Sequence, residues 1–327
     1  MGSFLRNAKV RSIAFQVVVL LATVGLVVWL ALNTATNLAA RGIAGGFDFL
    51  SRSARFPLSQ NIIPYDTTDS FAWALFVGLG NTIYASAWII VAATLLGFAV
   101  ALGRRGRNPL ARTVSTTFVE MARNTPLVVQ LLFWYALVTL SLPHPRNALE
   151  PLPGVYLTNR GLYLPAPSVS DGAIGVEAPV MGRFNFEGGF DLSPEFVAML
   201  AGLVLYSAAF VAEIIRAGID SVGVGQWEAA RAGGLTERQA LRLIVMPQAL
   251  RVIVPPMISQ YINIVKNTTL ALVVGYPDLA SVVATTINQT GQAVEGVAIL
   301  MAVFLGLSLM ASLLLNWYNR RIMEPRR

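Results

Sequence analysis

Six long apolar runs constrain this chain more than any other feature of its sequence. A helix needs roughly 20 apolar residues to cross the hydrocarbon core of a bilayer, and in that core its backbone N–H and C=O groups must bond within the helix. The candidate spans are Ile13–Leu32, Phe71–Leu102, Phe118–Leu140, Phe196–Ile215, Val252–Val274 and Val297–Trp317. Charged residues make up only 13% of the chain, against about 25% in soluble domains. We therefore expect an all-α membrane protein with six transmembrane helices.

Basic residues indicate which side of the membrane each predicted loop occupies. They cluster before the first span, after the second and after the last, at Arg6, Lys9 and Arg11, at Arg104, Arg105, Arg107 and Arg112, and at Arg320, Arg321, Arg326 and Arg327. Loops rich in Lys and Arg tend to stay in the cytoplasm, so six crossings place both termini there. The same placement explains the net charge of +7 without nucleic acid as a partner.

The residue types present exclude several chemistries. The chain has no cysteine and a single histidine, His144, which rules out disulfides, thiolate nucleophiles and metal sites built from Cys or His clusters. Lysine occurs only at Lys9 and Lys266, and neither lies in the G-x-x-x-x-G-K-[ST] loop that binds nucleotide phosphates. We therefore expect no catalytic residue, cofactor or metal in this chain, and any ATP-driven role requires a separate subunit.

The predicted spans divide the chain into three parts. Residues 1–70 hold the first helix and an outer segment with an interfacial helix, residues 71–318 hold the other five spans, and residues 319–327 form a cytoplasmic tail. The longest interruption is the outer insertion 141–194, which contains eight prolines and seven glycines. That composition cannot form a long helix. The insertion is either a cap that docks a partner outside the membrane or an ordered but inert loop.

A charged segment interrupts the apolar spans at residues 226–247, which read QWEAARAGGLTERQALRLIVMP. Gly233 and Gly234 end a first short helix, because glycine tolerates the left-handed conformation past a helix terminus. Thr236 and Gln239 have the capping-box spacing that starts a second helix, and Pro247 is expected to kink or stop it. Two short helices at an angle form a knob, which suits docking into a partner's groove or serves as an ordinary connector.

The same segment resembles the coupling loop of permease subunits in binding-protein-dependent ABC importers. That loop has the form E-A-A, three residues, G, nine residues, I, one residue, L-P. The matching residues here are Glu228, Ala229, Ala230, Gly234, Ile244 and Pro247, with Met246 at the Leu position. The resemblance implies a five-helix permease core preceded by one N-terminal helix. It also implies that the loop docks on a cytoplasmic ATPase dimer, which binds ATP and Mg²⁺.

Further stretches are similar to a narrower branch of that family. VEMARNTPLVVQLLFWY (119–135) and PQALRVIVPPMISQYINIVKNTTLALVVGYPDL (247–279) resemble polar-amino-acid permeases, and the N-terminal extension with the outer insertion resembles the general L-amino-acid type (Aap/Bzt, Q/B-like subunit). This resemblance implies a bacterial inner-membrane protein that pairs with a second permease subunit in a heterodimer, and the alternative is a homodimer. A periplasmic binding protein would deliver the amino acid. The alternative is a secondary amino-acid transporter or channel that ATP does not drive.

Polar residues inside the spans are candidates for the substrate path, because ionisable side chains in a membrane are costly and tend to face a cavity or a partner. The candidates are Lys266, Asn263, Asn267, Thr268 and Thr269 in the fifth span, Glu213 in the fourth and Glu120 in the third. Lys266 could attract an α-carboxylate and Glu213 an α-ammonium. Alternatively, Glu213–Arg216 and Glu120–Arg123 are i, i+3 ion pairs, and Lys266 satisfies backbone carbonyls where its helix breaks.

Overall fold

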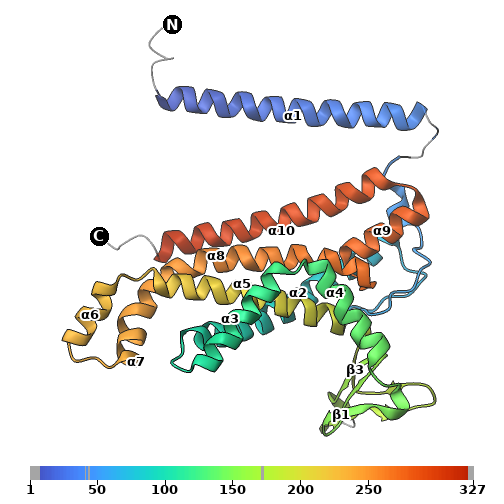
Figure 1. Ribbon diagram of the computed structural model, residues 1–327. Coiled ribbons are helices and arrows are strands. Elements are labelled where there is room, and N and C mark those ends of the chain that lie inside the picture. Colours follow the sequence, from blue (N-terminus) through green and yellow to red (C-terminus); the bar gives the residue numbers. More distant parts are fainter. Residues whose placement is uncertain (1–7, 41, 43–44, 171–172, 323–327) are drawn as a thin grey trace.

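The computed structural model describes residues 8–40, 42, 45–170 and 173–322, and helices dominate it (Figure 1). The long helices are α1 (Ala8–Ala40), α2 (Phe71–Arg105), α5 (Pro194–Asp220), α8 (Met246–Asn267) and α10 (Ala293–Ile322). The shorter helices are α3 (Pro109–Asn124), α4 (Leu127–Ala136), α6 (Val224–Ala232), α7 (Glu237–Ala240) and α9 (Leu279–Thr290). Arg6, Arg326 and Arg327, which helped to orient the sequence, lie outside the described residues.

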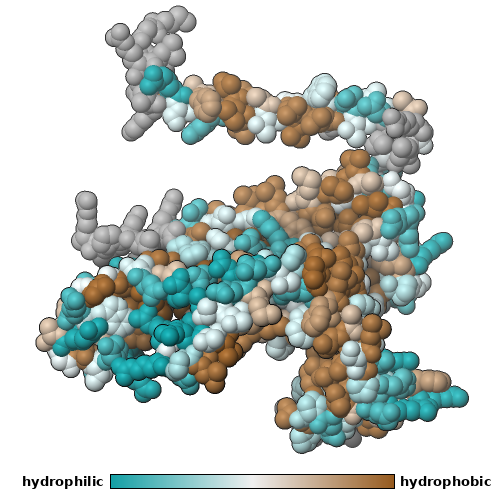
Figure 2. Space-filling view, in the orientation of Figure 1, coloured by the Kyte–Doolittle hydropathy of each residue, from teal (hydrophilic) through white to brown (hydrophobic). Residues whose placement is uncertain are grey.

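Five of the six predicted spans agree with the helices observed. Within the described residues, five helices are long and apolar enough to cross a membrane, and the bent pair of α3 and α4 makes six if it counts as one span. The five are α1, α2, α5, α10 and the continuous stretch Glu237–Val274 that contains α8. Figure 2 shows apolar residues over the middle of the bundle and hydrophilic residues at the end that holds α6 and α7, as a membrane-embedded belt requires.

The third predicted span is broken, which corrects the expectation of one helix from Phe118 to Leu140. The segments Pro109–Asn124 and Leu127–Ser141 meet at an angle of 104°. Pro126 stands at the break and has no backbone N–H to continue the hydrogen-bond ladder. The side-chain amide of Gln130 donates to the carbonyls of Ala122 and Thr125, at 2.8 and 3.1 Å. These two bonds satisfy carbonyls that the break would otherwise leave without partners.

The pair α2 and α5 forms the centre of the bundle, and a glycine sets their separation. A side-chain carbon added at Gly97 would lie 2.6 Å from a Val211 methyl carbon and 2.9 Å from the Ala208 carbonyl oxygen. The two helices therefore approach more closely than any larger residue at position 97 would allow. In a membrane the hydrophobic effect does not drive helices together, so van der Waals packing at close approach stabilises the pair.

The segment 33–70 differs from its prediction. It holds no long interfacial helix: α1 runs on to Ala40, and beyond it the described residues contain one short 3₁₀ turn, Asp48–Ser51. Phe49 is fully buried and meets the ring of Phe71 at the start of α2, with 5.9 Å between ring centroids. Phe49 and Phe56 of this segment therefore pack against the bundle, whereas Phe47 is exposed.

The outer insertion forms short strands, which the sequence analysis did not assign. Its described residues make an antiparallel sheet in the order β1-β2-β3-β8 and two hairpins, β4-β5 and β6-β7. The strands are Leu149–Leu152, Val155–Thr158, Gly161–Leu164, Ala166–Ser170, Ala173–Glu177, Val180–Met181, Phe186–Glu187 and Phe190–Leu192 for β1 to β8. Figure 1 shows this β module at the opposite end of the bundle from α6 and α7. The expectation that no long helix forms here is confirmed.

Candidate functional site

The predicted two-helix knob exists, and a specific hydrogen-bond pattern ends its first helix. Past the end of α6, the N–H of Leu235 donates to the Ala230 carbonyl at 3.1 Å, and that of Gly234 donates to the Arg231 carbonyl at 2.9 Å. This is the Schellman pattern, which needs a left-handed residue. Gly234 supplies it with φ +77°. The sequence motif therefore has glycine at the position where the chain must reverse.

The second helix of the knob begins as predicted but does not stop. The Thr236 side chain accepts from the Gln239 N–H, and the Gln239 side chain accepts from the Thr236 N–H, so both halves of the capping box are present. The helix then continues through a π-helical turn, Leu241–Val245, into α8. The N–H of Met246 bonds to the Leu241 carbonyl five residues back, which widens the turn just before Pro247. Of the two predicted alternatives, a kink or a stop at Pro247, the stop does not occur, because the helix continues past Pro247 into α8.

The six motif residues divide into an exposed and a packed group. Glu228, Ala229, Gly234 and Pro247 are exposed, whereas Ala230 is buried and Ile244 is half-buried. The packed pair lies where α6 contacts the π-helical turn Leu241–Val245, and the exposed group leaves a charged and irregular surface free. No described group of this chain covers that surface, and a docking partner requires such a surface.

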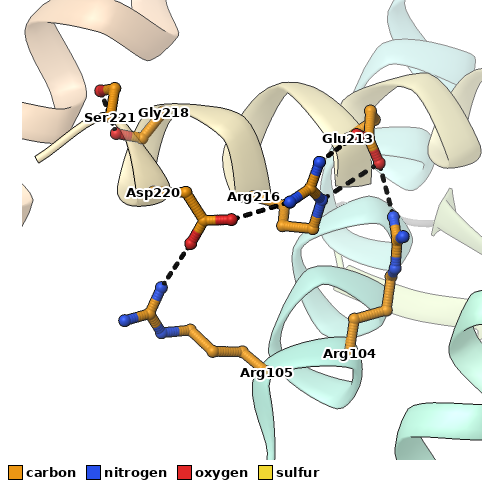
Figure 3. A network of polar contacts seen from close by, with 7 residues as sticks. All are labelled: Arg104, Arg105, Glu213, Arg216, Gly218, Asp220 and Ser221. Carbon is orange, nitrogen blue, oxygen red and sulfur yellow. Dashed lines mark hydrogen bonds and ion pairs between the residues drawn. The ribbon is translucent and has the colours of Figure 1, made fainter.

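An ionic network lies where α2 and α5 end near the knob (Figure 3). The Glu213 carboxylate pairs with Arg104 of α2 and with Arg216 of its own helix. Arg216 also pairs with Asp220 at 2.7 Å, and Asp220 pairs with Arg105 at 3.0 Å. The i, i+3 ion-pair alternative for Glu213 is confirmed. Because arginines hold both of its carboxylate oxygens, Glu213 is engaged in joining helices.

Glu120 and Arg123 do not behave as the sequence alternative proposed. Glu120 is exposed on α3, and no ion pair between these two residues occurs in the part of the chain that the structure describes. The Arg123 guanidinium instead lies 5.2 Å from the centroid of the Phe210 ring on α5. A cation above an aromatic face is favourable, so Arg123 binds its neighbouring helix and leaves Glu120 unpaired among the described residues.

Lys266 lines a cavity of about 530 Å³ between α2, α8 and α10. Of the residues that line this cavity, Lys266 alone is charged, and the hydroxyls of Ser86 and Ser308 donate to carbonyls of their own helices. Tyr261 also lines it, and its hydroxyl lies 3.0 Å from that of Thr94. The wall of the cavity is therefore almost entirely apolar, which suits an apolar group of a small molecule. Lys266 borders the cavity but is itself exposed.

The polar neighbours of Lys266 have separate positions. The buried Thr268 and the half-buried Thr269 begin the 3₁₀ segment Thr268–Val274, and their hydroxyls donate to the carbonyls of Val265 and Lys266, at 2.8 and 2.7 Å. They satisfy the backbone where the helix geometry changes. Asn263 is exposed and Asn267 half-buried, and neither lines the cavity. The structure thus brings together Lys266 and the cavity, but not the other fifth-span candidates.

A buried polar hub around Asn81 was missed by the sequence analysis. The Asn81 side-chain amide donates to the carbonyls of Gln60 and Pro277, both at 2.9 Å, and its oxygen accepts from the Ile62 N–H at 3.3 Å. The side chain thereby joins α2, the segment before it and the turn between α8 and α9. The available signal was an asparagine inside an apolar run, which is costly without partners.

Asp278 lies beside this hub and is fully buried. It caps α9, because one carboxylate oxygen accepts from the Ser281 N–H at 2.9 Å, while the other has no hydrogen-bond partner in the described structure. Burial raises the pKa of Asp278 to about 7, since the charged form loses its hydration. The described residues contain no group of three or more His, Cys, Asp or Glu that could hold a metal ion.

The fold and the exposed segment define a class: a membrane protein with several candidate spans and, between two of them, an exposed two-helix knob. The chain belongs to the family of binding-protein-dependent transport system inner membrane components, whose model matches residues 93–324.

Named relatives cover nearly the whole chain. It is 42% identical to the putative amino-acid ABC transporter permease protein YhdX of Escherichia coli, over 97% of this chain and 95% of that protein. It is 37% identical to the general L-amino acid transport system permease protein AapQ of Rhizobium johnstonii, over 98% and 94%. A crystal structure of an amino acid ABC transporter with histidines matches 77% of this chain and 95% of its own, with TM-score 0.59 and 26% identity.

Proposed function

We propose that this chain is the permease subunit of an ATP-driven, binding-protein-dependent importer of amino acids. The exposed knob between spans, with Glu228 and Gly234 on its surface, carries the proposal. The relatives named as amino-acid permeases supply the substrate class. The chain has no phosphate-binding loop of the P-loop type, so the energy would come from ATP and Mg²⁺ bound by a separate ATPase dimer.

The proposed complex has further members. A second permease subunit completes the membrane path, and we infer a heterodimer because the general L-amino-acid type pairs two different permeases. A periplasmic binding protein delivers the amino acid on the side of the β module. The knob, the start of α1 and the end of α10 lie at one end of the bundle (Figure 1), which supports cytoplasmic termini in a bacterial inner membrane.

Lys266 is the residue we assign to the amino-acid carboxylate. It is the one charged residue among those that line the apolar cavity and it is exposed at the edge of that cavity, so an anionic group beside it would gain a charge-assisted hydrogen bond. Lys266→Met should raise the KM for uptake by about 10- to 100-fold, the cost of one such bond. Lys266→Arg, which keeps the charge, should recover part of the loss. Unchanged uptake of acidic and neutral amino acids by Lys266→Met would return Lys266 to a structural role.

One experiment tests the importer function. The chain is reconstituted in liposomes with its partner permease, the ATPase and the binding protein, and uptake of a panel of radiolabelled amino acids is measured. Uptake should require ATP and stop when the ATPase carries a substitution that blocks hydrolysis. Uptake that an ion gradient drives equally well without ATP would instead support the secondary transporter. Competition between amino acids in the same assay gives the substrate range.

A further inference from the structure

Arg105, the last residue of α2, contacts two different elements at once. Its guanidinium donates to the Asp220 carboxylate at the end of α5, at 3.0 Å, and lies 5.1 Å from the centroid of the Trp227 ring on α6. The sequence analysis used Arg105 only to orient the chain and did not single out Trp227. The structure thus places a cation from α2 between the end of one membrane helix and the first helix of the knob.

The two contacts lie on either side of a short link. α5 ends at Asp220 and α6 begins at Val224, so residues 221–223 alone connect them. Arg105 holds a residue just before that link and a residue just after it. The link is held on its α5 side, where the Ser221 hydroxyl donates to the Gly218 carbonyl at 2.7 Å and Val222 is buried. Arg105 adds a second constraint on the angle between the two helices.

A second residue of α6 is attached to a different helix. Gln248 of α8 donates its side-chain amide to the Gln226 side chain, at 3.1 Å. Trp227 itself is half-buried and packs against the core cluster formed by α2, α3, α5 and α8. The helix that carries Glu228 is therefore held to α2 by Arg105 and to α8 by Gln248.

We propose that Arg105 is a positioning residue that transmits displacement of α6 to α2 and α5. The inference rests on the proposed function, since an ATPase must move the knob. When the knob shifts, Arg105 pulls the ends of α2 and α5 with it, while Gln248 pulls α8, which lines the Lys266 cavity. Without Arg105, α6 can turn about the link 221–223, and part of the displacement that the ATPase imposes on α6 does not reach α2 and α5.

The test measures ATP hydrolysed per amino acid taken up by the reconstituted complex. Arg105→Ala should raise this ratio about fivefold, the effect of losing a weak ion pair and a cation–π contact. Trp227→Ala should raise it similarly, and the double variant should be no worse than the more affected single variant. Trp227→Phe keeps an aromatic face and should recover most of the coupling. Arg107→Ala is the matched control, because Arg107 is an exposed arginine of the same cluster.

The results distinguish failure of the proposed importer function from failure of the proposed role of Arg105. If the wild-type complex shows no ATP-dependent uptake, the proposed importer function fails. If the wild-type complex is coupled but Arg105→Ala matches Arg107→Ala, or the two single effects add in the double variant, the positioning role of Arg105 is overturned. Co-purification of the ATPase shows that a variant assembles. Should Arg105→Ala fail to assemble, Arg105→Lys and Trp227→Phe decide the question through the same ratio.

Discussion

Helix α2 carries a polar cluster towards each end, and the two clusters are built in opposite ways. The cluster at its arginine end consists of full charges that are partly exposed: the Arg105 and Asp220 side chains are 36% and 48% accessible. The cluster at the other end centres on Asn81, a neutral side chain that is fully buried. Exposed ion pairs contribute little and can be remade in water, whereas buried polar groups are costly to leave unpaired. The first cluster therefore suits a part that moves, and the second a part that stays fixed.

The largest effect is expected at the knob next to the charged cluster. Gly234→Pro should abolish transport-linked ATP hydrolysis, because proline cannot adopt φ +77° and lacks the N–H that bonds the Arg231 carbonyl. Membrane insertion should be unaffected, since Gly234 is exposed and outside the spans. A charge reversal at the exposed Glu228 should abolish coupling in the same way, through the ATPase contact.

A graded control separates geometry from docking. Gly234→Ala keeps the N–H and only strains the backbone, at a cost of about 1 kcal/mol, so it should retain most of the coupled activity. ATPase rates with and without the loaded binding protein measure the result. Wild-type coupling in both Gly234→Pro and the Glu228 reversal would remove the assignment of 226–247 as the coupling segment.

Asn81→Ala tests the fixed side of the comparison. It removes three hydrogen bonds, of which one is buried and two are partly buried. Orphaned buried groups cost about 1–3 kcal/mol each, so we expect a loss near the lower end of the sum, about 3 kcal/mol. Thermal unfolding of the purified protein in detergent measures it. The matched control is Asn124→Ala, an exposed asparagine on α3, which should change stability by less than about 0.5 kcal/mol. Equal effects of the two variants would contradict the view that burial strengthens the hub.

The sequence predicted the parts of this molecule that follow local rules. The spans follow from the length of the apolar runs, the Gly234 reversal from glycine itself, and the Thr236 capping box from a three-residue spacing. All three patterns lie within short stretches of sequence. The break at Pro126 was missed because the apolar run continues past the proline. The bonds by which Gln130 satisfies the carbonyls freed at the break become visible only in the structure. The Asn81 hub and the Arg105–Trp227 contact join residues 122 to 196 positions apart in sequence, and no single-sequence periodicity encodes such pairs.

Asp278→Asn tests whether the buried carboxyl beside the Asn81 hub makes the stability of the protein depend on pH. Since the pKa of the buried carboxyl is raised from 3.8 to about 7, the fold favours the protonated form. Its stabilising effect is fully present below about pH 4 and is lost as the pH rises to about 7, at roughly 1.4 kcal/mol per pH unit. Asparagine caps helices as well as aspartate and does not ionise. The variant should therefore unfold at a nearly constant temperature over this window, while the wild type becomes less stable.

A control residue identifies the source of that pH dependence. Hydrogen bonds from Thr68 lower the pKa of Asp66, an exposed carboxylate. The pH dependence of its contribution to stability is therefore opposite to that of Asp278, because any stability that Asp66 contributes is lost as the pH falls. Asp66→Asn should leave the decline between pH about 4 and 7 in place. If the unfolding temperature of Asp278→Asn falls as the pH rises, as that of the wild type does, another group causes the pH dependence, and water reaches the Asp278 carboxyl.

Arg216→Ala should have the smallest effect, and it tests the movable side directly. Its guanidinium pairs with Glu213 and Asp220, but Arg104 and Arg105 still hold those carboxylates after the substitution. The Arg216 side chain is 37% accessible, so we expect a loss below about 1 kcal/mol. Thermal unfolding at low salt and at about 1 M salt measures it, and the difference from wild type should shrink at high salt because exposed charges are screened. A loss as large as that of Asn81→Ala, persisting at high salt, would mean that the charged cluster is as rigid as the buried hub and could not be remade during transport.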